Sequence, residues 1–142
     1  MAAERTKKRR RDVLPLSVAT GRPAAPQWLS DDASIVFSEV CDWLETMGTL
    51  TLHDAHEIER YAVAKAEHRA LTQHIAEHGA VQETETRSGV FRSQSAEAKR
   101  QLALGRELKD LADRLGLHPR SRAAMPKKIE TSPAAFLMRK RS

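Results

Sequence analysis

The chain has 142 residues, with 24 lysines and arginines against 19 aspartates and glutamates. This length suits a single domain, and we find neither a signal-peptide core nor an apolar run near the roughly 18 residues that span a bilayer. The lone cysteine, Cys41, excludes an internal disulfide framework, which agrees with a reducing compartment. We expect Cys41 to be a small buried residue of a helix.

The charge is distributed unevenly along the chain. Residues 1–25 hold seven basic and two acidic residues, and residues 126–142 hold five basic and one acidic residue. The span 26–125 is acidic, with 12 basic and 16 acidic residues. Strongly charged segments with little apolar surface stay disordered. We therefore predict a disordered basic arm over 1–25, a folded core over 26–125 and a basic tail over 126–142.

The basic clusters are candidates for DNA binding, because cationic segments attract polyanions. Improved solubility and a nuclear-import signal are alternative interpretations. Near the end of the chain, three apolar residues precede three basic ones, which suits a peptide that docks into a partner's groove; a disordered end is the alternative. The candidate DNA-binding residues are Lys7, Lys8, Arg9, Arg10, Arg11, Lys127 and Lys128, and the candidate docking residues are Phe136, Leu137, Met138, Arg139, Lys140 and Arg141.

The first predicted helix begins after Ser30, a favourable N-cap residue that two aspartates follow. Gly48 ends this helix. Its apolar stripe consists of Val36, Val40, Trp43, Leu44 and Met47.

A second, long helix is predicted to open at 51–54, where the sequence resembles a capping box, and to end before Gly79. About 27 residues would give it a length of roughly 40 Å. Large apolar side chains are few along it, so we expect one arm of a helical hairpin or a helix packed against a neighbouring subunit. Its narrow stripe is Ala55, Ile58, Ala62, Leu71 and Ile75.

Residues 81–91 alternate weakly and contain the turn signal Ser88-Gly89, which indicates an extended excursion or a small hairpin. A third helix is predicted from about Ser95 to Leu115, and the fold class that follows is all-α. The apolar stripe of this third helix is Leu104, Leu108, Leu111 and Leu115.

A sharp corner follows the third helix. Gly116 occupies the position that takes a positive φ, and Leu117 can fold back as its apolar partner. Pro119 is favourable at the first position of a short fourth helix. That helix would hold Arg120 and Arg122 rigidly, so we add both to the candidate DNA-binding residues.

One pattern is typical of an enzyme. His74, Glu77 and His78 match the H-x-x-E-H pattern of zinc hydrolases, with both histidines on one helical face. A third protein ligand and a folded cleft would also be required, so solvated helix histidines are the favoured interpretation. The sequence contains no phosphate-binding P-loop, and its few aromatic residues argue against a stacking platform for single strands. We expect no catalytic site, metal or cofactor.

The corner sequence Leu-Gly-Leu-x-Pro-x-Ser-Arg, ending at Arg122, resembles a motif of tailed-phage terminase small subunits of the siphophage type. The likeness extends from about Pro23 to Met125 and includes Trp43-Leu44 and the hinge Gly48-Thr-Leu50-Thr51. Two features depart from the family: His118 replaces the usual threonine cap, and 83–91 lacks Asn/Pro-rich character.

The resemblance implies a non-enzymatic subunit that forms a ring, often a nonamer, binds double-stranded viral DNA and regulates a separate large subunit with ATPase and nuclease activity. It also implies action in the host cytoplasm and absence from the mature virion. A small DNA-binding transcription regulator is the main alternative, although the predicted first helix has no lysine or arginine. A zinc hydrolase is a weaker alternative.

Overall fold

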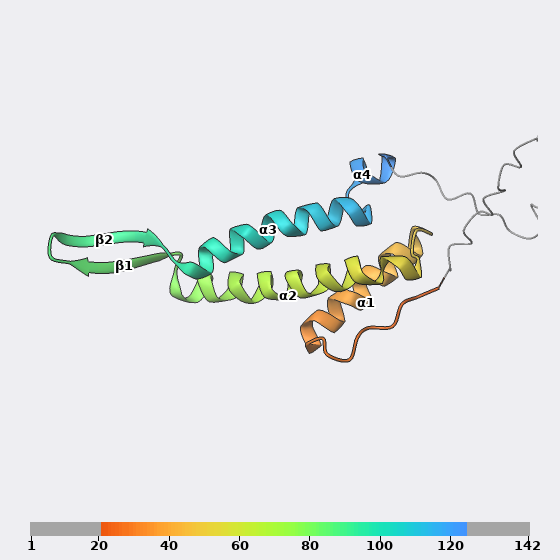
Figure 1. Ribbon diagram of the computed structural model, residues 1–142, viewed down its shortest axis with the longest axis horizontal. Helices are drawn as coiled ribbons and strands as arrows, with labels where there is room; N and C mark the ends of the chain where they lie inside the picture. Colours follow the sequence, from red (N-terminus) through yellow and green to blue (C-terminus); the bar gives the residue numbers. More distant parts are fainter. Residues whose placement is uncertain (1–20, 125–142) are drawn as a thin grey trace, which may run out of the picture.

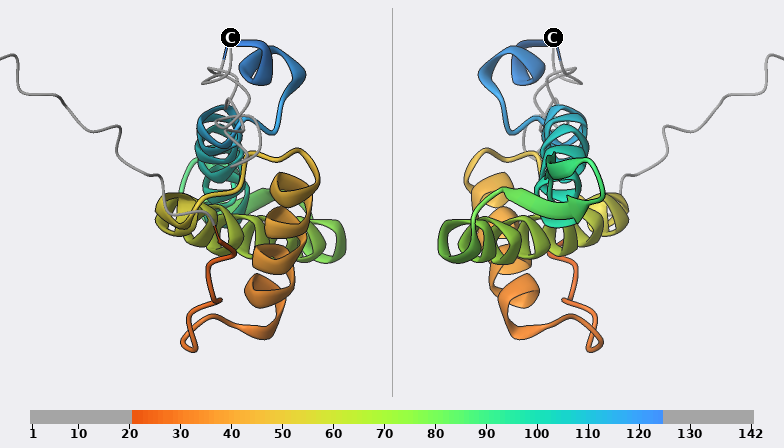
Figure 2. Two further views of the ribbon diagram at one scale, coloured as in Figure 1. Left: turned by 90° about the vertical axis from the view of Figure 1, so that its right-hand side faces the viewer. Right: turned by 90° about the vertical axis from the view of Figure 1, so that its left-hand side faces the viewer.

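The computed structural model describes residues 21–124, which are mostly helical (Figure 1). Two long helices form a hairpin, a pair of strands extends from its far end, and the first helix packs across the other end (Figure 2). Within residues 21–124 no helix is both long and apolar enough to cross a membrane. The elements in chain order are α1 (Asp31–Thr46), the 3₁₀ turn η1 (Leu52–Asp54), α2 (Ala55–His78), β1 (Val81–Thr86), β2 (Gly89–Gln94), α3 (Ala96–Leu115) and α4 (Pro119–Ala124).

Helix α1 has the predicted ends. The hydroxyl of Ser30 accepts a hydrogen bond from the backbone N–H of Ala33 at 3.2 Å. Gly48 takes a φ of 67° just after the helix, where no side chain opposes the left-handed conformation. Of the predicted apolar stripe, Val36, Val40 and Leu44 are buried and Met47 is partly buried, whereas Trp43 remains 48% exposed. Its position one residue before Leu44 turns it by about 100° away from the centre of the buried face.

The capping box that opens α2 is present. The carboxylate of Asp54 accepts a hydrogen bond from the backbone N–H of Thr51 at 2.9 Å. A 3₁₀ turn occupies the first three predicted positions, so the helix itself has 24 residues. Ile58 and Ala62 are fully buried against α1. Further along, Leu71 is only partly buried, as the narrow stripe predicted.

A β-hairpin interrupts the all-α fold that we predicted. Strands β1 and β2 pair in antiparallel register, with Thr86 opposite Gly89. The turn is therefore formed by Arg87 and Ser88, one residue earlier than the Ser88-Gly89 signal suggested. The body of the chain is helical, as predicted. The extended segment is also present, but the two strands reach Gln94 whereas the prediction ended at Phe91.

Helix α3 buries its predicted leucine stripe. Leu104 and Leu108 pack against Ala64 of α2, while Leu111 is also buried. The main core lies where the end of α3 meets α1 and α2. This core consists of Leu29, Ala33, Val36, Phe37, Val40, Cys41, Leu44, Ile58, Ala62, Ala112, Leu115 and Leu117.

Ion pairs span the seam between α2 and α3. Arg100 donates two hydrogen bonds to the carboxylate of Glu67, at 2.8 and 2.9 Å. This bidentate contact lowers the pKa of Glu67, because the guanidinium stabilises the charged carboxylate. Arg60 and Glu107 form a second pair at 3.4 Å. These side chains are solvent-exposed, so each pair contributes at most about 1 kcal/mol.

Candidate nucleic-acid interface

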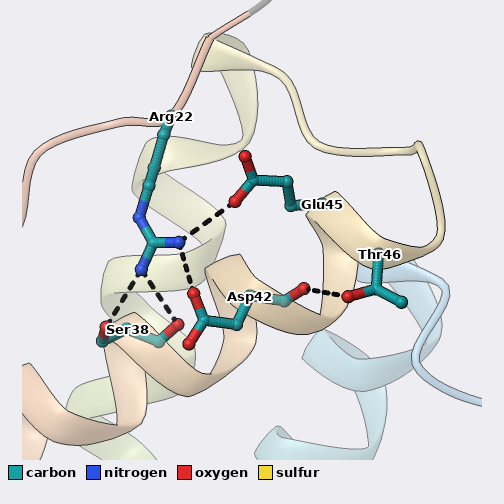
Figure 3. A network of polar contacts seen from close by, with 5 residues as sticks. All are labelled: Arg22, Ser38, Asp42, Glu45 and Thr46. Atoms are coloured by element: carbon teal, nitrogen blue, oxygen red, sulfur yellow. Dashed lines mark hydrogen bonds and ion pairs between the residues drawn. The ribbon is translucent and has the colours of Figure 1, made fainter.

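The segment before α1 is held to the helix by Arg22 (Figure 3). Its guanidinium pairs with Asp42 and, at 3.1 Å, with Glu45. It also donates to the hydroxyl of Ser38 at 3.0 Å. The hydrogen bond to Asp42 is the main reason that the pKa of Arg22 is raised. Residues 21–25, which we assigned to the disordered arm, therefore lie along α1, because α1 supplies two carboxylates for the one arginine of this segment.

The corner after α3 has the predicted backbone. Gly116 takes a left-handed conformation with φ 71° and ψ 29°. The N–H of Leu117 donates to the carbonyl of Ala112 at 2.9 Å, which is the long bond of a Schellman motif. The side chain of Leu117 is buried in the main core. This arrangement fixes the direction in which α4 begins at Pro119.

Arg122 connects the corner to α1. Its guanidinium lies 3.1 Å from the sulfur of Met47, the residue that caps α1. A thioether sulfur is a weak acceptor, so this contact orients Arg122 without neutralising its charge. Arg120, on the same short helix, is exposed and forms no ion pair with any residue between 21 and 124. Both predicted corner arginines are therefore free to meet an anion.

The first and last described residues lie at the same end of the molecule (Figure 1). Gly21 lies beside Leu52, at the start of α2, and Arg122 contacts Met47, at the end of α1. The basic segments 1–20 and 125–142 thus begin from one end, opposite the β-hairpin. We call this the α1 end. The predicted binding residues Lys7 to Arg11, Lys127, Lys128 and Phe136 to Arg141 all fall outside the described residues.

The helical body has few cations to offer a polyanion. Residues 21–124 hold 13 basic and 16 acidic residues. Several arginines of the body are paired with carboxylates: Arg60, Arg69, Arg92, Arg100 and Arg114. Helix α1 carries aspartates and glutamates and no lysine or arginine, so it does not resemble the recognition helix of a transcription regulator. Within 21–124, Arg120 and Arg122 of the α1 end have no carboxylate partner, and neither do Lys99, Arg106 and Lys109 along α3.

The zinc pattern lies at the exposed end of α2. The rings of His74 and His78 stack with their centroids 4.2 Å apart, and Glu77 accepts a hydrogen bond from Gln73 at 3.2 Å. Between residues 21 and 124, no group of three or more histidine, cysteine, aspartate or glutamate side chains is placed to hold a metal ion. These contacts are those of solvated side chains on a helix surface.

Sequence reasoning missed several exposed apolar residues, among them Trp28, Val63 and Leu102. Trp28 precedes α1 and is 65% exposed, while Leu102 of α3 is 54% exposed. Val63 of α2 is exposed to a smaller extent. A signal was available for Leu102, because it lies about 160° around the helix from Leu104 and so cannot share its buried stripe. No comparable signal marked Trp28, which lies in the segment leading to the first helix.

The chain was also compared with known proteins. The family model described as "Phage terminase, small subunit" matches residues 33–131. The match begins in the first turn of α1 and continues past α4, so it includes both long helices, the β-hairpin and the corner. No curated protein and no solved structure matches the chain.

Proposed function

Because the chain belongs to the family of phage terminase small subunits, we propose that it binds double-stranded phage DNA and regulates the large terminase subunit. Membership supports a role in phage DNA packaging. The proposal assigns no catalytic step to this chain. ATP hydrolysis and DNA cleavage would belong to the large subunit, and the work would take place in the host cytoplasm, with the small subunit absent from the mature virion.

The observation that carries the proposal is the family match over the whole helical body. The arrangement of charge supports it. Arg120 and Arg122 lie at the α1 end, where the two basic segments begin. The body itself has more acidic than basic residues and would repel a phosphate backbone. We therefore expect DNA to bind at the α1 end, through the cationic segments and the corner arginines together.

A salt titration of duplex binding tests this assignment. Each phosphate that a cation neutralises contributes roughly 0.9 to the slope of log K against log salt. Removing residues 1–11 and 127–142 should lower both the affinity and the slope. Substituting Arg120 and Arg122 with alanine should lower them further. As a matched control, Arg60 and Arg114, which are paired with carboxylates on the body, should tolerate alanine with an unchanged slope.

The opposite result would reject the electrostatic assignment. If the truncated chain binds duplex with the same salt dependence as the full chain, the DNA contact lies on the body.

We also propose that the chain assembles into a homo-oligomeric ring, with a nonamer as the expected size, and that Phe136 to Arg141 dock on the large subunit. Helix α2 supports the assembly, because its second half is poorly covered within one chain. Native mass spectrometry should show one discrete oligomer, and a monomer at all micromolar concentrations would contradict it. Deleting 136–141 should abolish co-purification with the large subunit and leave the oligomer intact.

A further inference from the structure

Exposed apolar residues form a patch where the segment before α1 crosses α2. Trp28 and Val63 line the same two surface hollows, and the partly buried Ala66 and the exposed Ala70 line one of them. Both hollows adjoin the Trp28 side chain. One is lined by Val63, Glu59 and Leu104, and the other by Ala66, Ala70 and Asp32. We call this patch, Trp28, Asp32, Glu59, Val63, Ala66 and Ala70, the tryptophan face.

A second patch lies on α3, on the side away from its leucine stripe. Leu102 is exposed at its centre. Lys99, Arg106 and Lys109 lie on the same side, because the four positions are spaced by three, four and three residues. We call this patch, Lys99, Leu102, Arg106 and Lys109, the leucine face. Asp110 and Asp113 lie on the same side one turn further on, so the cationic part ends at Lys109.

The unpaired charges of the two faces are complementary, because the two arginines that also line the first hollow, Arg60 and Arg100, are paired with Glu107 and Glu67. None of the three cations of the leucine face forms an ion pair with a residue in the range 21–124, whereas the arginines of the α2–α3 seam do. On the tryptophan face, Asp32 and Glu59 likewise have no cationic partner within 21–124. Charged groups without partners around an apolar centre are the arrangement of an interface rim.

The two faces also match in length. Lys99 and Lys109 are ten residues apart, which is roughly 15 Å along a helix, and Glu59 and Ala70 are separated by roughly 16 Å. One helix face could therefore cover the other along its whole length. The faces lie on different sides of the α2–α3 hairpin, so they cannot meet within one chain.

We propose that the leucine face of one chain packs against the tryptophan face of a second copy, with Leu102 filling a hollow beside Trp28. The proposal rests on the oligomer of the proposed function and identifies its contact surface. Because the two faces differ, the contact is heterologous: each chain uses one face to receive a neighbour and the other to bind the next. Such a contact closes into a ring when the rotation permits.

Two single substitutions test the contact. Leu102→Asp places a carboxylate in the leucine face, and Val63→Asp does the same in the tryptophan face. Each variant keeps one face intact, so each alone should be monomeric by native mass spectrometry. Mixed in equal amounts, they should form a 1:1 heterodimer, because one intact face of each kind remains. A contact between two copies of the same face could not produce this result.

Ile35 supplies the matched control. It lies on the outer side of α1 and is as exposed as Leu102, at 55% against 54%. Ile35→Asp should retain the wild-type oligomer. Far-ultraviolet circular dichroism should show native helix content for all variants. If an aspartate variant unfolds, charge reversals provide the same pair of disrupted faces: Lys99→Glu with Arg106→Glu at exposed positions, and Glu59→Lys at a half-buried one.

Four outcomes would overturn the proposal. A monomeric wild type would reject it together with the proposed oligomer. Folded variants that retain the wild-type oligomer would reject this contact alone. Monomeric variants that form no heterodimer would reject its heterologous geometry. Charge reversals on the leucine face that leave the oligomer intact but weaken duplex binding would make that face a DNA surface.

Discussion

The two ends of the α2–α3 hairpin differ in what covers them. At the α1 end, α1 packs on α2, and Ile58 and Ala62 are fully buried. Beyond Ala64, no residue of α2 is fully buried. The far end carries β1 and β2, whose side chains are almost all exposed, and we call it the β end. The core that α2 and α3 share with α1 is therefore larger than the cluster that the two helices form alone, which consists of Ala64, Leu104 and Leu108.

This difference predicts where the chain opens first. Most helical stability comes from packing an apolar face, and an isolated two-stranded hairpin is only marginally stable in water. The β end has polar surface contacts instead, such as the ion pair between Arg92 and Glu83 at 2.7 Å. Local unfolding follows the density of buried apolar contacts, so the β end should open more readily than the α1 end. The following substitutions compare the two ends directly.

The largest expected effect is at Ile58, in the core of the α1 end. Ile58→Ala should lower the free energy of unfolding by about 2–5 kcal/mol, because it leaves a cavity among fully buried side chains. Ile75, on the same helix near the β end, is only partly buried, so Ile75→Ala should lower the free energy of unfolding by less than about 1 kcal/mol. Denaturant unfolding at one fixed protein concentration measures both. Equal losses would mean that the two ends are equally well packed in solution.

A smaller effect is expected at Gly116, whose φ of 71° fixes the corner. Gly116→Ala should lower the free energy of unfolding by roughly 1–2 kcal/mol, because a side chain is disfavoured in the left-handed conformation. Gly105→Ala, inside α3, is the control: no atom lies within 4 Å of a Cβ added at Gly105, so alanine there should raise the free energy of unfolding by about 0.4–1 kcal/mol. A neutral Gly116→Ala would show that the corner contributes no rigidity to the α1 end.

The smallest expected effect is the pH dependence of stability that the ion pair between α2 and α3 contributes. The pKa of Glu67 is lowered in the folded chain by Arg100, so the pair stabilises the fold above the unfolded pKa and this contribution is lost as the pH falls through the folded value. The difference in melting temperature between wild type and Glu67→Gln should therefore be present at neutral pH and shrink between about pH 5 and pH 3.

Because both side chains are exposed, the Glu67 contribution should stay below about 1 kcal/mol. Glu83→Gln, which removes the similar pair on the β-hairpin, should leave the melting temperature of the body unchanged. A larger effect at Glu83 than at Glu67 would reverse the proposed order of stability along the hairpin.

The local signals in the sequence were sufficient to predict most helix ends. Ser30, Gly48 and Gly116 each act through their own backbone or a bond to the next turn, so the local sequence determines them. The apolar stripes of α1 and α3 were found by periodicity for the same reason. The strand pairing was harder, because β2 extends to Gln94 through polar residues that carry no alternating pattern.

The candidate interface was predicted less completely. The corner arginines were identified from their motif, but the approach of Gly21 and Arg122 to the same end depends on how α1 crosses α2. Arg22 was counted with the arm because its acidic partners follow it by 20 and 23 residues. Contacts at such separations depend on packing, and no local pattern predicts them.

The buried cysteine provides a direct way to time the opening of the α1 end. Cys41 is the only thiol of the chain and is fully buried in the main core. Burial raises its pKa, because the charged thiolate is poorly solvated there. Since the thiolate is the reactive form, a thiol-specific dye should label this protein only when the core around Cys41 opens. The rate of labelling therefore measures how often the core opens, without any engineered probe.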